Sequence, residues 1–260
     1  MIYAGIDAGS RAIKIVLWDK ASHSVLAWGY SPQGSQPARH VQETYSRLLA
    51  EQHLAPQDVR YVVATGYARA GVEAANTTIT EITCHAAGVH HLLPDVRTVV
   101  EIGGQDSKLL RLTEKGTVRD FAMNDRCAAG TGRFLELVAA RLDCQISDLG
   151  VLAAEARSPA VVSSMCAVFA ETEIIGLLSS GVRPEDIVAG VQQSIASRIS
   201  AMAGGDVTPP VAFTGGVAMV AGMEKALANV LGQSVVVPDR PQFTGALGAA
   251  LLAAKQRNDE

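Results

Sequence analysis

The chain lacks several features that would assign it to a common class of function. It has no run of basic residues and a formal net charge of -4, which argues against nucleic acid as its main partner. No apolar stretch reaches the roughly 18 residues that a membrane-spanning helix requires. Asp7 interrupts the first apolar run too early for a signal peptide. Its four cysteines are widely spaced over 260 residues, unlike a secreted disulfide framework. These absences predict a cytoplasmic protein without nucleic-acid or membrane partners.

The two common nucleotide-binding fingerprints are also missing. The chain contains neither a P-loop nor the glycine pattern of dinucleotide-binding domains. Instead it has glycine-containing turns directly after predicted strands, at residues 7–10, 103–106 and 214–216. Glycine in such turns lets backbone amides approach phosphate oxygens closely. One such turn is weak evidence because Gly and Asp are common in any turn. Three of them on a repeated frame favour a phosphate site.

Hydrophobic periodicity predicts alternating strands and helices. Strands are expected at residues 2–7, 12–18, 24–29, 60–65, 97–102, 108–112, 117–123, 211–213 and 235–237. Helices are expected at residues 38–53, 79–93, 128–142, 146–156, 167–180, 185–203 and 244–255, and the segment 217–231 completes the pattern. A β-β-β-α-β-α unit therefore occurs twice, which predicts two facing α/β halves with a cleft between them. One larger mixed sheet is the alternative.

The residue types in these turns indicate how a nucleotide would be held. Asp7 is expected to hold Mg²⁺ through water, and Ser10, Arg11 and Lys14 to bind phosphates. Gln105 or Asp106 is expected to position the attacking water. The predicted catalytic residues are therefore Asp7, Gln105 and Asp106. The predicted nucleotide-binding residues, the last three of them for adenine by position only, are Gly9, Ser10, Arg11, Ala12, Ile13, Lys14, Gly103, Gly104, Gly130, Gly132, Gly215, Gly216, Met219 and Gln242.

Two cysteines, Cys127 and Cys166, stand alone, and each opens a stretch with helical spacing. Cys127 is followed by a glycine-rich turn of the kind whose amides can surround an anion. Judged from the residues alone, a lone cysteine in an α/β protein is most often a small buried apolar side chain.

The turns and the cysteine block together resemble a known family. The frame is similar to that of the actin, Hsp70 and sugar-kinase superfamily of ATPases. Within it, the chain resembles the ATP-dependent activators of 2-hydroxyacyl-CoA dehydratases and the related ATPase subunits of benzoyl-CoA reductases. The resemblance runs the full length, through residues 5–10, 64–67, 81–85, 102–108, 123–136, 214–217 and 245–250, and the block 123–136 is highly specific. One departure is Glu101, where the activators usually carry Asp.

This resemblance implies an actin-like ATPase fold of two ribonuclease-H-like halves, residues 1–96 with 243–260 and residues 97–242. It also implies one 4Fe–4S cluster shared by a homodimer, with Cys127 and Cys166 of each subunit as ligands. Unpaired amides and the helix dipole after Cys127 would then face the cluster, with Gly130 and Gly132 allowing close approach. Cys84 and Cys144 are expected to be structural, and His85 to be a packing histidine.

The implied activity is ATP-driven transfer of single low-potential electrons. The donor would be ferredoxin or flavodoxin, and the acceptor a 2-hydroxyacyl-CoA dehydratase or a related acyl-CoA reductase. The cofactors would be ATP or ADP, Mg²⁺ and the cluster. A benzoyl-CoA reductase subunit is the near alternative. A small-molecule kinase and an actin-like scaffold of the same fold are the distant ones.

Overall fold

Two mixed sheets, each with five strands, organise the chain. The computed structural model describes residues 1–163 and 166–256. It divides into two compact units. Unit 1 comprises Met1–Asp95, Leu112–Val118 and Gln242–Glu260, and unit 2 comprises Val96–Arg111 and Arg119–Pro241.

The sheet of unit 1 has the strand order β3-β2-β1-β4-β5. Its strands are β1 (Ile2–Ala8), β2 (Ala12–Asp19), β3 (Ser24–Pro32), β4 (Val59–Thr65) and β5 (Thr77–Thr78). The first three strands pair antiparallel as a meander, and β4 returns parallel to β1. Alternation along β1 and β2 sends Ile6, Ile13 and Ile15 to one core and Tyr3 and Val16 to the other. Both faces of this sheet are therefore buried.

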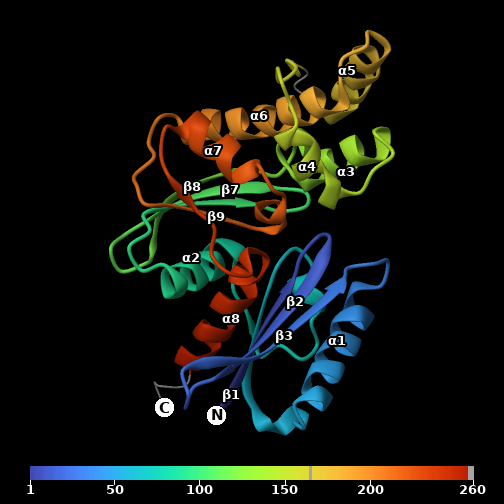
Figure 1. The fold of residues 1–260 in the computed structure, drawn as a ribbon. Helices are drawn as coiled ribbons and strands as arrows, with labels where there is room; N and C mark the ends of the chain where they lie inside the picture. Colours follow the sequence, from blue (N-terminus) through green and yellow to red (C-terminus); the bar gives the residue numbers. More distant parts are fainter. Residues whose placement is uncertain (164–165, 257–260) are drawn as a thin grey trace. The chain divides into compact units, whose positions relative to one another are not determined.

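Helices cover the two faces of the first sheet (Figure 1). Helix α1 (Pro37–Glu51) packs its apolar stripe on one face, and α8 (Thr244–Lys255) lies on the other with α2 (Glu81–Leu92) against it. Gly88 and Gly248 let α2 and α8 approach at backbone distance, because a Cβ on Gly248 would overlap the Cys84 carbonyl oxygen.

The sheet of unit 2 has the order β10-β9-β6-β7-β8. Its strands are β6 (Thr98–Ile102), β7 (Ser107–Leu112), β8 (Val118–Asn124), β9 (Val211–Thr214) and β10 (Val235–Val236). The helices α3 (Gly132–Arg141), α4 (Leu149–Ala154), α5 (Ala167–Ser179), α6 (Pro184–Ala203) and α7 (Met223–Leu231) belong to the same unit. Their apolar faces and the sheet share one core, which includes Phe134, Phe213 and Leu109.

The two sheets have the same topology. If the second sheet is written from its other edge, β8-β7-β6-β9-β10 matches β3-β2-β1-β4-β5 strand for strand. The predicted repetition of the β-β-β-α-β-α unit is confirmed, and the alternative of one larger mixed sheet is wrong.

Several element boundaries differ from the sequence prediction. The helix expected at residues 128–142 is divided into the 3₁₀ turn η3 (Ala128–Gly130) and α3, because Thr131 between them is extended. The helix expected at 146–156 likewise begins as η4 (Ile146–Asp148), and the segment 217–231 begins as η5 (Gly216–Met219) before α7. The two-residue strand β5 was not predicted. The remaining short turns are η1 (Pro56–Asp58), η2 (Arg69–Gly71) and η6 (Pro241–Phe243). Across residues 1–163 and 166–256, no helix combines the length and apolarity needed to cross a membrane.

Candidate functional site

The first part of the candidate site is an acid–lysine pair in unit 1. Asp7 on β1 and Lys14 on β2 are direct partners in the antiparallel register. Lys14 Nζ donates to Asp7 Oδ2 at 3.1 Å, and the Asp7 side chain is 7% exposed. A nearly buried carboxylate requires such a partner, because desolvation of an unpaired charge is costly. Asp7 is thus fixed in place before any ligand arrives.

Three glycines surround the Asp7 carboxylate. A Cβ on Gly66, which has φ of +94°, would lie 2.6 Å from Asp7 Oδ1. A Cβ on Gly9 would lie 3.6 Å from the same oxygen, and one on Gly245 3.5 Å from Asp7 Oδ2. Gly9 belongs to the predicted nucleotide site, whereas Gly66 and Gly245 were not predicted to be site residues. The missing side chains leave space beside the acid for a ligand.

Unit 2 repeats this arrangement. Glu101 on β6 faces Lys108 on β7 in register, as Asp7 faces Lys14. Lys108 Nζ donates to Glu101 Oε2 at 3.0 Å and to Asp106 Oδ2 at 2.6 Å. In both units the neighbouring parallel strand ends in Thr followed by a glycine of positive φ, Thr65-Gly66 and Thr214-Gly215.

Glu101 and Lys108 were not predicted as site residues, although the sequence carried a signal for them. Each half has an acid at the end of its first strand and a lysine seven positions later, which places the two opposite each other across the turn. Glu101 occupies the position of Asp7 in the repeat, and its longer side chain still reaches Lys108.

The glycine-rich turn of unit 2 is hydrogen-bonded to helix α3. The Gly103 amide donates to the Asp106 carbonyl at 2.9 Å and closes the turn, leaving Gln105 exposed. The amides of Gly132 and Arg133, in the first turn of α3, donate to the carbonyls of Gly103 and Gly104, both at 2.9 Å. The expectation that unpaired amides after Cys127 face a cluster is wrong for these two, because they are bonded to the turn at 103–104.

Cys127 lies at the start of the segment that leads into α3. Its amide donates to Asn124 Oδ1 at 3.1 Å, and Asn124 Nδ2 donates to the Cys127 carbonyl at 2.9 Å. Asn124 ends β8, so the strand holds the cysteine backbone through two hydrogen bonds. Cys127 is half-buried. Gly130 is buried further along, and a Cβ there would lie 3.3 Å from Asn124 Nδ2.

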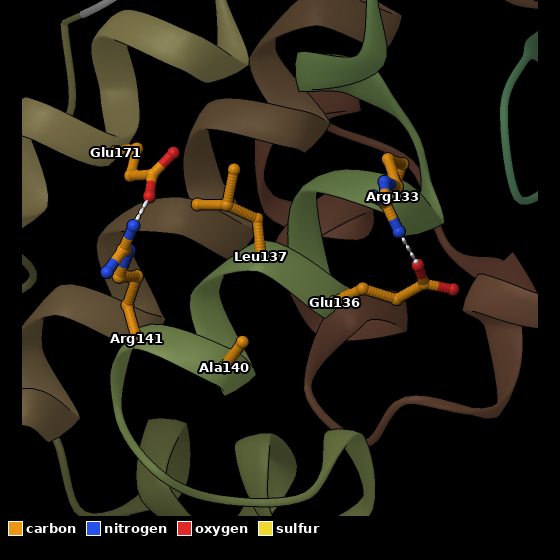
Figure 2. A pocket seen from close by; sticks show the side chains of 6 residues that line it. All are labelled: Arg133, Glu136, Leu137, Ala140, Arg141 and Glu171. Atoms are coloured by element: carbon orange, nitrogen blue, oxygen red, sulfur yellow. Dashed lines mark hydrogen bonds and ion pairs between the residues drawn. The ribbon is translucent and has the colours of Figure 1, made fainter.

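Cys166 is exposed and directly precedes α5. Helix α5 packs against η3 and α3, so the segments that follow the two cysteines are neighbours. A small depression of about 290 Å³ lies on this side. Figure 2 shows the side chains that line it, which are those of Arg133, Glu136, Leu137, Ala140, Arg141 and Glu171. Arg141 of α3 pairs with Glu171 of α5 across it. This ion pair ties the helix after one cysteine to the helix after the other.

The four cysteines differ in their burial. Burial raises the pKa of the Cys84 thiol to about 12 and also raises the pKa of Cys144. A raised pKa disfavours the thiolate, which is the form that binds metals. Cys127 and Cys166 have solvent access and lie in one unit. Among the described residues no group of three or more His, Cys, Asp or Glu could hold a metal. Cys144 is half-buried like Cys127, so exposure sets only Cys84 apart from the other three. Cys127 and Cys166 together would supply two of the four thiolates of such a site.

The other predicted nucleotide residues divide by burial and by unit. Ser10 is half-buried and Arg11 exposed, whereas the side chains of Ala12 and Ile13 lie in the core, so only their main chain could reach a ligand. For adenine, Gly216 and Met219 are exposed in unit 2, whereas Gln242 belongs to unit 1. The three residues predicted for the adenine pocket are therefore divided between the two units.

Comparison with known proteins agrees with these features. The model of the BadF/BadG/BcrA/BcrD ATPase family matches residues 4–253. The activator of lactoyl-CoA dehydratase from Anaerotignum propionicum is 44% identical over 97% of both chains. The (R)-2-hydroxyglutaryl-CoA dehydratase activating ATPase from Acidaminococcus fermentans is 42% identical over 97% of this chain and 96% of its own. A benzoyl-CoA reductase subunit from Thauera aromatica is 35% identical over 97% of this chain and 93% of its own.

Solved structures of other proteins have a similar fold. The activator of the 2-hydroxyisocaproyl-CoA dehydratase from Clostridium difficile with bound ADPNP superposes with a TM-score of 0.93 at 39% identity, covering 100% of this chain and 96% of the other. A glucokinase of the ROK family from Streptomyces griseus has a TM-score of 0.62 at 12% identity, covering 98% and 100% of the two chains. This second likeness concerns the fold alone. The predicted actin-like and sugar-kinase type of fold is confirmed.

Proposed function

The chain belongs to the BadF/BadG/BcrA/BcrD ATPase family, and from that premise we propose that it is an ATP-hydrolysing activator of a 2-hydroxyacyl-CoA dehydratase. It would pass single low-potential electrons to that enzyme or to a related acyl-CoA reductase. The names of its relatives support this acceptor class.

One observation carries the proposal. The carbonyls of Gly103 and Gly104 accept hydrogen bonds from the first turn of α3, and Cys127 precedes that turn by five residues. A ligand that moves the 103–104 turn must therefore move α3 or break two hydrogen bonds. The turn predicted to bind phosphate and the segment that bears a thiol are mechanically joined.

The residues predicted for nucleotide binding are proposed to keep their predicted roles. Asp7 would hold Mg²⁺ through water, and Ser10, Arg11 and Lys14 would bind phosphate oxygens with the amides around Gly9. From unit 2, Gln105 or Asp106 would position the attacking water, and Glu101 would fix Lys108 beside it. Residues near Gly216, Met219 and Gln242 would surround adenine. The glycines 103, 104, 130, 132, 215 and 216 provide close backbone approach.

Cys127 and Cys166 would hold half of a 4Fe–4S cluster, and a second copy of the chain would supply the other half. When bound, such a cluster supplies one-electron transfer. An electron moved uphill costs about 1.4 kcal/mol for each ~59 mV, so a low-potential acceptor requires an external drive such as ATP. Ferredoxin or flavodoxin would be the electron donor.

The alternatives are less well supported. The activators of dehydratases are 44% and 42% identical to this chain, whereas the benzoyl-CoA reductase subunit is 35% identical. A small-molecule kinase shares only the fold. Neither a kinase nor an actin-like scaffold has a use for Cys127 and Cys166.

The test begins with protein purified without oxygen. Iron and acid-labile sulfide, ATP hydrolysis, and activation of a purified lactoyl-CoA dehydratase are measured on the same preparation. We expect about four iron atoms per dimer and ATP-dependent activation of the dehydratase. Cys166→Ala is expected to lose iron, whereas Cys144→Ala, the matched control, keeps it.

Three outcomes would contradict the proposal. An iron-replete Cys166→Ala dimer would disprove the ligand assignment. A colourless protein that phosphorylates a small molecule would favour the kinase. Activation of benzoyl-CoA reductase in place of every 2-hydroxyacyl-CoA dehydratase tested would favour the reductase subunit.

A further inference from the structure

A buried histidine lies beside the acid–lysine pair of unit 1. His85 is on α2 and only 5% exposed. Its Nδ1 is 2.9 Å from the hydroxyl oxygen of Thr244, the first residue of α8. This contact joins two helices across 159 positions of sequence. Sequence reasoning predicted only a packing role for this imidazole.

The other ring nitrogen, Nε2, lies next to the position that a side chain on residue 245 would occupy. A Cβ placed on Gly245 would lie 3.1 Å from His85 Nε2 and 3.5 Å from Asp7 Oδ2. Both atoms therefore border the same small space, which exists because residue 245 has no side chain. Asp7 Oδ2 is also the oxygen that accepts from Lys14 Nζ. The side chains of Asp7 and His85 are buried, and that of Lys14 is half-buried.

The backbone frame around His85 is rigid. A Cβ on Gly88 would overlap the Thr244 carbonyl oxygen, and one on Gly248 would overlap the Cys84 carbonyl oxygen. Helices α2 and α8 are thus in backbone contact on both sides of His85. The two helices cannot slide past each other to accommodate a rotation of the His85 ring, because closely packed elements resist small displacements.

We propose that His85 is a positioning residue for Asp7 in ATP hydrolysis. Thr244 holds Nδ1, and Nε2 on the opposite side of the ring restrains the Asp7 carboxylate, which would hold Mg²⁺ through water. The neutral imidazole that donates from Nε2 toward a carboxylate accepts at Nδ1 from the Thr244 hydroxyl. The inference rests on the proposed function, because it assigns His85 to the same ATP site.

Two substitutions separate this role from a packing role. Asn places its amide near the position of Nδ1, and Gln reaches the position of Nε2. His85→Asn is therefore expected to keep the bond to Thr244 and lose the restraint on Asp7, and His85→Gln the reverse. The conservative variant that rescues the protein identifies which ring nitrogen matters.

The measurements are kcat and KM for ATP hydrolysis and, without turnover, the Mg²⁺ concentration at which ADPNP reaches half of its maximal stabilisation of the protein. For His85→Asn we expect kcat to fall, or the Mg²⁺ requirement to rise, by about 10- to 100-fold, as for other residues that orient metal-binding groups. KM for ATP at saturating Mg²⁺ stays near the wild-type value. His85→Gln is expected to lie within a few-fold of the wild type. His91→Gln is the matched control, on the same helix but packed edge-on against Trp18.

Two results would overturn the proposal that His85 positions Asp7. One is equal rates for the wild type and both His85 variants. The other is that His85→Asn retains the wild-type rate and His85→Gln does not. If both variants fail to fold, Gly245→Ala decides, because its new Cβ touches Nε2 and Asp7 Oδ2 directly. Wild-type-like Mg²⁺ dependence in that variant would also overturn the proposal. A wild-type protein that hydrolyses no ATP would overturn the proposed function and this inference together.

Discussion

Gly132 shows how one residue can join two parts of a site. A Cβ at this position would lie 3.1 Å from the Gly103 carbonyl oxygen and 3.3 Å from Val217 Cγ2. These distances are slightly too short, so the 103–104 turn or the first turn of α3 must shift by a few tenths of an ångström.

Gly132→Ala is therefore expected to weaken the coupling between the 103–104 turn and Cys127 while changing the stability of the protein little. Helix propensity favours Ala by up to about 1 kcal/mol, which offsets the crowding. We expect stability within about 1 kcal/mol of the wild type and a smaller effect of ADPNP on the alkylation rate of Cys127 in iron-free protein. Mass spectrometry of the labelled cysteine measures that rate. An unchanged nucleotide effect would show that the 103–104 turn and Cys127 are not coupled through α3.

Cys84 provides a prediction about pH. Burial raises the pKa of its thiol from 9.0 to about 12 in the folded protein. The unfolded chain then binds fewer protons than the folded one between these values, so this thiol's contribution to stability is present below pH 9 and lost as pH rises toward 12.

The free energy of unfolding should therefore fall more steeply above pH 9 in the wild type than in Cys84→Ala. The difference in slope is at most about 1.4 kcal/mol per pH unit. Urea titrations from about pH 8.5 to about pH 10.5 measure it. Parallel curves for the two proteins would mean that Cys84 does not titrate differently on folding.

At the scale of elements, the α2–α8 crossing leaves no room for a side chain on either of its glycines, Gly88 and Gly248. A Cβ on Gly248 would overlap the backbone of Cys84, whereas a Cβ on Gly176 of α5 would have no described atom within 4 Å. Gly248→Ala is expected to destabilise the protein by about 1–3 kcal/mol or more. Gly176→Ala is expected to stabilise it by up to about 1 kcal/mol. Chemical denaturation of both variants tests this contrast, and equal effects would contradict it.

Helix α5 buries fewer of its residues than α2 or α8. Only Ala167, Ala170 and Ile174 of its residues are buried, while Val168 and Phe169 beside Cys166 are 67% and 70% exposed. An element with so few buried contacts depends more on single polar links. The Arg141–Glu171 pair of Figure 2 is such a link.

Glu171→Gln is expected to cost less than about 1 kcal/mol of global stability, because both groups are partly exposed. It should nevertheless raise the alkylation rate of Cys166 in iron-free protein, since α5 loses its tie to α3. Arg141→Glu combined with Glu171→Arg should restore the slow rate. If the reversed pair reacts as fast as Glu171→Gln, the ion pair does not position α5.

For the whole molecule, we expect nucleotide binding at the proposed site around Asp7 to stabilise the folded state. A ligand that binds only the folded state stabilises it by about 2.7 kcal/mol at a concentration of about 100 times Kd. ADPNP with Mg²⁺ is expected to raise the Tm of the wild type. Asp7→Asn should lose this shift, and Asp19→Asn, at the other end of the same hairpin, should keep it. An undiminished shift in Asp7→Asn would remove Asp7 from the nucleotide site.

Much of the molecule follows from local patterns. Strand and helix periods located the elements, and the repeat of strand, turn and strand predicted two sheets of equal topology. The boundaries failed where tertiary contacts intervene: η3 and α3 are separate because the amides of Gly132 and Arg133 bond to a turn about thirty residues earlier in the chain. Such long-range hydrogen bonds have no signature in a local window.

The sequence by itself determined the repeated frame, the glycine turns and the pair of solitary cysteines, since each is a matter of residue type and spacing along the chain. Tertiary structure alone decided that Lys108 lies between Glu101 and Asp106, that His85 and Gly245 flank Asp7, and that α3 is bonded to the 103–104 turn. These relations join residues on different elements. They arise from the register of paired strands and the close crossing of helices, which only the folded chain defines.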